Sequence, residues 1–284
     1  MGGDAGSLDL TPLLAPERAT LLELLRGLSP VDWDLPTECP EWDVKGVALH
    51  VLGDDLSLLT RQRDASTNSL IVFAKDHPGS SFRELLDGFN EQWVTASKFF
   101  STTLVLDMLD LVGRWSDDFY GNVGLDTISG EPVGFFATDA PSPYWQVIAR
   151  EYVERFVHQS QIRRAIGAPE LNGELVTGAA RVVVHALSAW MRDYGPALGS
   201  TIAVDFGTAG SWACRRESDH WSVTECATAA PTARITIAPE RTVAMLSRGL
   251  SYDDALASIV VTGDEAVARG ALDIIAPILG RPDE

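Results

Sequence analysis

The spacing of apolar residues changes near residue 200, and this change limits the folds that the chain can adopt. Before it, leucine and valine recur at helical spacing, as in the first predicted helix over residues 11–28. Residues 200–236 instead carry alternating or β-branched runs such as TIAVDF, which predict short strands joined by turns. Helical spacing returns from residue 239. The order predicts a two-domain α+β protein, with a helical domain over residues 1–197 and a small α+β domain over residues 198–284.

The composition is that of an acidic globular protein. The chain has 284 residues and a formal net charge of −18. An acidic surface repels phosphate groups, which argues against a nucleic-acid partner or binding to an anionic membrane surface. No run of about 20 apolar residues could cross a bilayer, and the first residues lack a signal-peptide pattern. Three cysteines without a CxxC motif fit a reducing compartment. We therefore expect a cytoplasmic protein.

Two predicted helices each place a histidine among apolar neighbours. The first follows Pro40 and contains His50, and the second ends at Gly167 and contains Glu154 and His158. Residues four apart share a helix face, so Glu154 and His158 lie together. With His50 they would form a two-histidine, one-carboxylate set suited to a divalent metal with open positions. Spacing alone also fits a surface pair worth tenths of a kcal/mol.

Three nearby residues allow two interpretations each. Gly46 and Gly53 flank His50 inside its helix, where each glycine costs about 1 kcal/mol relative to alanine. They either let a metal-bound thiol or substrate approach the backbone, or let helices pack closely. Cys39, just before this helix, is either a reactive thiol or a small buried side chain. His185, within a strongly apolar helix, is interpreted as a core residue with a satisfied ring.

Two segments of the chain resemble the signatures of the mycothiol-dependent maleylpyruvate isomerase family. They are LSPVDWDLPTECPEWDVKGVALH, residues 28–50, and ERFVHQSQIRRAIG, residues 154–167. The resemblance implies a DinB-like up-down four-helix bundle that binds a divalent metal, Zn²⁺ in most members. It also implies a following small α+β domain similar to sterol carrier proteins. The segments GSWAC, residues 210–214, and VTGDEAVARGAL, residues 261–272, resemble that second domain.

The resemblance also implies roles for individual residues. The motif histidines and glutamate fall on His50, Glu154 and His158, which are thus the expected metal ligands. Gln161 stands where family members often have an aspartate, and a glutamine there can bind a cofactor only by hydrogen bonds. Arg248 is the candidate for the family's arginine near the thiol, with a catalytic and cofactor-binding role. The long segment 120–143, with Phe135 and Phe136, is expected to shape substrate choice.

The implied function is activation of a low-molecular-weight thiol, mycothiol. Coordination to a metal deprotonates a thiol and makes it a nucleophile at neutral pH. Addition of that thiolate to a maleylpyruvate-like cis-enoic acid, bond rotation and elimination would give the trans isomer. The same thiolate could instead be transferred to an electrophile. The alternative is a non-catalytic metal-bundle protein that binds a small ligand or partner. The expected partners are a small electrophilic substrate and the thiol, with the chain a monomer or homodimer.

Overall fold

The structure is a computed structural model that describes residues 7–225 and 230–279. Contacts divide the chain into two compact units, each described here by itself. The helical unit comprises Leu14–Val123 and Gln161–Pro169, and the sheet-containing unit comprises Met1–Leu13, Gly124–Ser160 and Glu170–Glu284. The mostly helical first part and the later sheet confirm the predicted two-domain α+β fold.

The helical unit is built mainly from helices. They are α1 (Thr11–Arg26), α2 (Val44–Leu58), α3 (Ser69–Asp76), α4 (Phe82–Ser97) and α5 (Thr102–Asn122), of which α1 begins in the other unit. Side chains cap the starts of α2 to α5. Asp43 caps α2 by accepting a hydrogen bond from the backbone N–H of Gly46 at 2.7 Å. Ser81 and Glu84 form a capping box at α4. Caps of this kind satisfy backbone donors that a helix start leaves unpaired.

One apolar core holds the helical unit together. Leu21 of α1, Val47 of α2, Leu109 of α5 and Ile162 of α6 (Tyr144–Ala165) are all fully buried in it. The side chains come from helices far apart in the sequence, so burial of their apolar faces fixes α2 in place. Helices from distant parts of the sequence, α4 with Val94 included, therefore contribute to the core that supports His50.

A buried ion cluster lies beside this core. The Arg18 guanidinium donates to both carboxylate oxygens of Asp55 at 2.8 and 3.1 Å, and it also contacts Asp117 at 3.3 Å. A Cβ atom on Gly113 would lie 2.2 Å from Arg18 Nε, so this helix position has room only for glycine. Arg18 and Asp55 are almost fully buried, and each needs the other as a charged partner.

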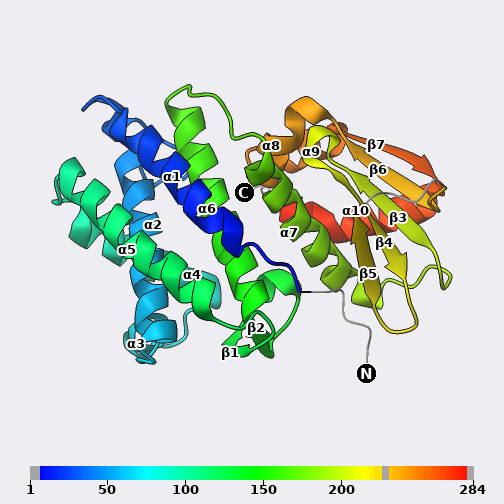
Figure 1. Ribbon diagram of the computed structural model, residues 1–284, viewed down its shortest axis with the longest axis horizontal. Coiled ribbons are helices and arrows are strands. Elements are labelled where there is room, and N and C mark those ends of the chain that lie inside the picture. Colours follow the sequence, from blue (N-terminus) through cyan, green and yellow to red (C-terminus); the bar gives the residue numbers. More distant parts are fainter. Residues whose placement is uncertain (1–6, 226–229, 280–284) are drawn as a thin grey trace. The chain divides into compact units, whose positions relative to one another are not determined.

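The larger sheet of the sheet-containing unit has five strands among the described residues, in the order β5-β4-β3-β6-β7. It comprises β3 (Thr201–Asp205), β4 (Ser211–Arg216), β5 (Trp221–Glu225), β6 (Ala233–Ile237) and β7 (Ile259–Gly263). Only β3 and β6 are parallel, and the other neighbours are antiparallel. Val204, Trp212 and Ile235 lie opposite one another and are buried, and α7 (Glu174–Trp190) and α10 (Glu265–Leu279) pack against the sheet (Figure 1). Two short helices complete the unit, α8 (Thr242–Leu246) and α9 (Tyr252–Ala257).

Three segments differ from the sequence prediction. Residues 64–80, for which no helix is predicted from the sequence, contain α3, which has no buried residue and packs Phe73 against Phe89 of α4. Segment 120–143, expected as a loop, contains the paired strands β1 (Ile128–Pro132) and β2 (Pro141–Pro143). Strand β7 had no predicted counterpart, because its identity depends on pairing with β6. Contacts also place α7, which precedes the expected boundary at residue 197, in the sheet-containing unit.

No helix among residues 7–225 and 230–279 is long and apolar enough to cross a membrane.

Candidate metal and thiol site

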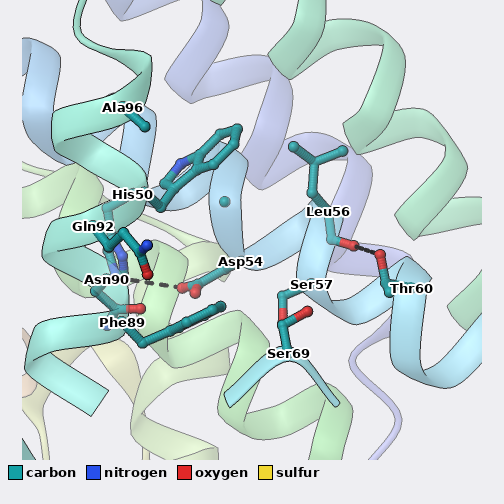
Figure 2. Close-up of a pocket in the computed structure, with 12 residues that line it drawn as sticks. His50, Asp54, Leu56, Ser57, Thr60, Ser69, Phe89, Asn90, Gln92 and Ala96 are labelled. Atoms are coloured by element: carbon teal, nitrogen blue, oxygen red, sulfur yellow. Dashed lines mark hydrogen bonds and ion pairs between the residues drawn. The ribbon is translucent and has the colours of Figure 1, made fainter. Parts of the chain in front are cut away.

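A pocket of about 390 Å³ opens in the helical unit beside His50. Figure 2 shows His50 and Asp54 of α2 facing Asn90 and Gln92 of α4, with Ser69 of α3 on another side. The π-helical turn Leu59–Arg63 ends α2 and brings Thr60 to the pocket wall. Turns of this kind are frequent at functional sites. The only charged or titratable side chains among the described lining residues are His50 and Asp54.

Two side chains fix the His50 ring. Its Nε2 lies 3.4 Å from Oδ2 of Asp54, one helical turn later. On another side the ring lies against Trp42, with 4.8 Å between ring centroids, and the Trp42 indole donates to Glu91 at 2.8 Å. Only 6% of His50 is exposed. Asp54 is not among the site residues predicted from the sequence, although its spacing from His50 equals that of Glu154 from His158 and could have identified it.

The glycines around His50 make room for aromatic side chains of the protein itself. A Cβ atom on Gly53 would lie 2.5 Å from the Trp93 indole, which donates its N–H to the Leu49 carbonyl at 2.7 Å. A Cβ atom on Gly46 would lie 2.9 Å from Cβ of Trp42. Of the two interpretations, close packing within the fold accounts for both glycines.

Glu154 and His158 come together on one face of α6, as their spacing predicts. Oε2 of Glu154 lies 3.7 Å from Nε2 of His158. The histidine is 8% exposed, whereas 44% of the Glu154 side chain is open to solvent. The pair therefore presents a nitrogen and an oxygen donor side by side, at the edge of a buried helix face.

These residues divide between the two units. His50 belongs to the helical unit, whereas Glu154 and His158 belong to the sheet-containing unit. Within the part of the chain that the structure describes, no three histidine, cysteine, aspartate or glutamate side chains are grouped closely enough to hold a metal ion. Joint binding of one metal by His50, Glu154 and His158 therefore stays a prediction.

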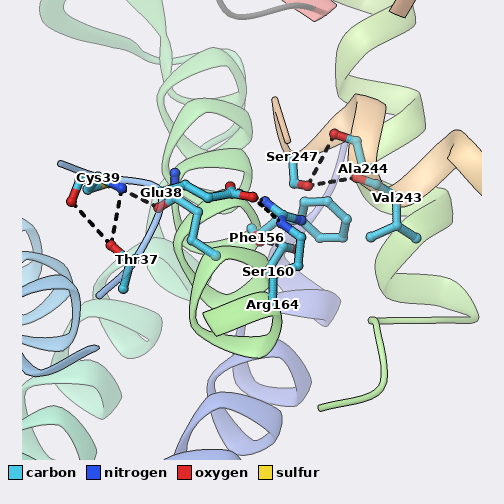
Figure 3. Close-up of polar contacts among 10 residues, drawn as sticks. Thr37, Glu38, Cys39, Phe156, Ser160, Arg164, Val243, Ala244 and Ser247 are labelled. Atoms are coloured by element: carbon cyan, nitrogen blue, oxygen red, sulfur yellow. Dashed lines mark hydrogen bonds and ion pairs between the residues drawn. The ribbon is translucent and has the colours of Figure 1, made fainter. Parts of the chain in front are cut away.

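Cys39 and Gln161 connect the two signature segments inside the helical unit. The Cys39 thiol donates to Oε1 of Gln161 at 3.3 Å, and its backbone N–H donates to Thr37 at 3.1 Å. Next to it, Glu38 accepts two hydrogen bonds of 2.7 Å from Arg164 (Figure 3). The predicted cofactor-binding role of Gln161 is untested, and its side chain has a structural partner in Cys39.

The described cysteines differ in their surroundings. Cys39 is partly buried, whereas Cys214 lies fully inside the sheet-containing unit, where burial raises the pKa of its thiol to about 12. A thiol with such a pKa is neutral and unreactive at neutral pH. Cys226 lies outside the described residues. Cys39 is thus the more accessible of the two described thiols.

Arg248 occupies an unusual backbone position in the sheet-containing unit. It follows α8 with φ of +55°, in the left-handed region that glycine favours. The N–H of Gly249 bonds the Ala244 carbonyl at 2.7 Å and that of Arg248 bonds the Met245 carbonyl at 3.1 Å. Helix α8 therefore ends in a Schellman motif, in which Arg248 occupies the left-handed position that glycine usually takes. Such strain is found at functional positions, and Arg248 is exposed.

His185 of α7 has the surroundings of a core histidine. Its Nδ1 lies 2.8 Å from the Arg181 carbonyl, and its ring meets the edge of Trp145 with 6.1 Å between centroids. Burial lowers the pKa of His185 below its usual value of 6.5, and the bond to Arg181 opposes this only in part. The ring is therefore held neutral in the folded protein.

We predict that His185 makes stability depend on pH. Its pKa is lower in the folded than in the unfolded chain, so unfolding takes up a proton at acidic pH. The contribution of neutral His185 to the free energy of unfolding is complete above about pH 6.5. It declines as the pH falls below that value. Urea unfolding of the protein and of His185→Gln at several pH values measures this. The wild type should lose more stability than the variant on acidification, and parallel pH profiles would contradict the prediction.

The comparisons with known proteins concern the segment that contains the pocket. Residues 14–97 match the family model of the mycothiol maleylpyruvate isomerase N-terminal domain. The matched segment includes His50 and Asp54, and it confirms the resemblance predicted from residues 28–50. The second signature, residues 154–167, lies outside it.

Two solved structures resemble this chain over most of its length. One is a crystal structure of a mycothiol-dependent maleylpyruvate isomerase mutant with a histidine replaced by alanine. It has a TM-score of 0.51 and 9% identity, with 89% of this chain and 91% of that chain covered. A second crystal structure of the mycothiol-dependent maleylpyruvate isomerase matches with a TM-score of 0.49, 9% identity, and 83% and 86% coverage. At this identity the first match shows a shared fold. No curated protein sequence matches the chain.

Proposed function

We propose that this protein is a metal-dependent enzyme that uses a low-molecular-weight thiol, mycothiol, to isomerise a small cis-unsaturated acid such as maleylpyruvate. The observation that carries the proposal is His50, which lies in a pocket wall with Nε2 beside a carboxylate. The match of residues 14–97 to the family domain supports the same assignment.

The donor chemistry of the chain fits a divalent metal. His50, Glu154 and His158 would hold it, since two imidazoles and a carboxylate suit Zn²⁺ with a position left for another ligand. Both histidine rings are largely buried, and each has a carboxylate oxygen within 4 Å of its Nε2. When bound, the metal lowers the pKa of a thiol so that a thiolate is available near neutral pH.

The described lining of the pocket offers no positively charged side chain to pair with the substrate's carboxylate. No lysine or arginine is among its described lining residues, whereas a small unsaturated acid carries at least one carboxylate. Trp93 and Phe89 form part of the wall. A positive side chain outside this lining would complement the metal ion in binding that carboxylate. We assign it to Arg248, whose guanidinium can pair with a carboxylate or stabilise a developing enolate.

We predict that Arg248→Gly separates stability from activity. Glycine relieves the left-handed strain, so the free energy of unfolding should stay the same or rise by up to about 1 kcal/mol. Loss of the guanidinium should lower kcat/KM by about 10²-fold or more. Urea unfolding and steady-state kinetics measure the two effects. Arg248→Lys keeps both the charge and the strained backbone, and it should retain part of the activity. Unchanged kinetics in Arg248→Gly would remove Arg248 from the site.

The proposed function is tested with the full-length, zinc-loaded protein. Incubation with mycothiol and maleylpyruvate should produce the trans isomer, and omission of either the metal or the thiol should abolish the product. A second reaction replaces maleylpyruvate with a general thiol-reactive electrophile. If the electrophile is turned over and maleylpyruvate is not, the activity at this site is thiol transfer and not isomerisation. Tight thiol binding without turnover of either compound would identify a non-catalytic binding module.

A further inference from the structure

We propose that this protein forms a two-fold homodimer through the outer face of α5, in which Phe99 of each copy enters a hollow on the other copy. All the residues of this face belong to the helical unit. None of them has a role in the proposed function. The face combines an apolar stripe along α5, an exposed phenylalanine before its first residue and a hollow at its last turns.

The apolar stripe of α5 consists of side chains that the helical unit leaves exposed. Leu104, Leu111 and Trp115 are 43%, 42% and 45% exposed, and the partly buried Met108 lies between them. Their spacing of four, three and four residues places them along one line of the helix, apart from the core residues of α5 such as Leu109. This spacing is typical of the seam through which one helix packs against another.

A hollow continues the stripe at the C-terminal end of α5. Its volume is about 470 Å³, and its described lining includes Trp115, Phe119 and Asn122. Arg63 also lines it, with the guanidinium 5.8 Å from the centre of the Trp115 ring. Aromatic rings and a guanidinium plane form a surface on which a further aromatic ring can stack.

Phe99 has the properties of a side chain that fills such a hollow on a second copy. It is 83% exposed, more than any other large apolar side chain among the described residues. It precedes Thr102, the first residue of α5, by three positions. The hollow lies at the opposite end of the helix, about 30 Å away at 1.5 Å per residue. Phe99 therefore cannot fill the hollow of its own copy.

A two-fold axis across the middle of α5 brings these features together. The two copies of α5 then pack antiparallel, with Leu104 opposite Trp115 and Met108 opposite Leu111 of the second copy. In this register Phe99 lies opposite the last turns of the second α5, where the hollow is. Because the contact is isologous, both phenylalanines and both hollows are used.

The charges at the two ends of the face are complementary in this arrangement. Nζ of Lys98 lies 5.5 Å from the centre of the Phe99 ring, so a cation accompanies Phe99. Asp118 lines the hollow that receives it. Arg63 is already bonded to Asp64 at 2.8 Å, which compensates its charge. The pairing of Lys98 with Asp118 favours a second copy as the occupant, against the general repulsion between copies with a net charge of −18 each.

The size of the face predicts a weak dimer. The exposed parts of Phe99 and Trp115 amount to roughly 250 Å² per copy. With the leucines and the flanking side chains, the area buried over both copies is on the order of 1,000 Å², below the range of about 1,200–2,000 Å² for stable complexes. We therefore expect a dissociation constant in the micromolar range.

Sedimentation equilibrium of the full-length protein, from a few micromolar to several hundred micromolar, measures the dimer. The wild type should pass from monomer to dimer over this range. Phe99→Ser should weaken dimerisation by about 30-fold or more, as for an interface hot spot. Phe82→Ser is the matched control, since Phe82 of α4 is 71% exposed and lies outside the face. It should dimerise as the wild type does, and circular dichroism checks that both variants are folded.

A charge reversal tests the register. Lys98→Glu places a carboxylate beside Asp118 of the second copy and should weaken the dimer, whereas Lys98→Glu with Asp118→Lys restores the pair and should recover most of the affinity. A wild type that stays monomeric at the highest concentration would overturn the proposal. A Phe99→Ser dimer as strong as the wild type, or a double variant no stronger than Lys98→Glu, would also overturn it. These measurements need neither metal nor thiol, so their outcome is independent of the proposed function.

Discussion

Replacement of His158 by alanine is expected to abolish both metal binding and activity. The ring is 8% exposed, and its Nε2 lies beside the Glu154 carboxylate. Loss of a ligand should weaken metal binding by more than about 100-fold, the upper range for residues outside the coordination shell. A metal that stabilises developing charge is worth several kcal/mol, so turnover should fall by about 10³-fold or more. Elemental analysis of untagged protein and the isomerase assay measure the two effects.

His77→Gln is the matched control for this experiment. His77 is exposed at the end of α3 and stacks on Phe73, with 3.9 Å between ring centroids. Its replacement should leave metal content and turnover unchanged. Full metal content in folded His158→Ala would contradict the proposed site. A wild type that carries less than about a tenth of an equivalent of metal, unchanged in the variant, would contradict metal dependence itself.

Replacement of Asp55 by alanine is expected to cost about 3–5 kcal/mol of stability, because it leaves the buried Arg18 guanidinium without its main partner. Asp117 remains, but it accepts only the longer hydrogen bonds of 3.3 Å from Nε and 3.5 Å from one terminal nitrogen of Arg18. The free energy of unfolding in urea measures the loss. The result matters for the site, since Asp55 anchors the helix that carries His50 and Asp54.

Two further variants show whether the unpaired charge of Arg18 causes the loss of stability in Asp55→Ala. The double variant Arg18→Leu with Asp55→Leu replaces the ion pair by apolar groups and should be less destabilised than Asp55→Ala. Asp110→Ala removes an exposed partner of Arg114 and should cost at most about 1 kcal/mol. If Asp55→Ala costs no more than Asp110→Ala, the buried pair has no special role in the fold.

Much of the candidate site followed from local sequence. Helical spacing alone places Glu154 and His158 on one face, because positions four apart meet within a single helix. The same rule applied to His50 indicates Asp54, which lies at the same separation in α2. Predictions of this kind need no knowledge of distant segments, and for that reason the motif-bearing helices could be predicted.

Contacts between distant segments could not be predicted in this way. Trp93 fills the space above Gly53, and Cys39 bonds Gln161 from 122 positions away. Strand β7 is defined by its pairing with β6, and the short helix α3 packs on α4 without burying any of its own residues completely. Each depends on which surfaces the fold brings together, and a local pattern carries no such information.

The sequence by itself determined the two-domain α+β class, the helices with the histidines, and Glu154 one turn before His158. Periodicity and capping are local, and they act wherever the segment lies. Only the tertiary structure decided that Asp55 is a buried anchor and Asp54 a pocket residue, although the two acids are adjacent. The reason is the partner that each meets, since Arg18 comes from α1, 37 positions earlier, while His50 lies on the same helix.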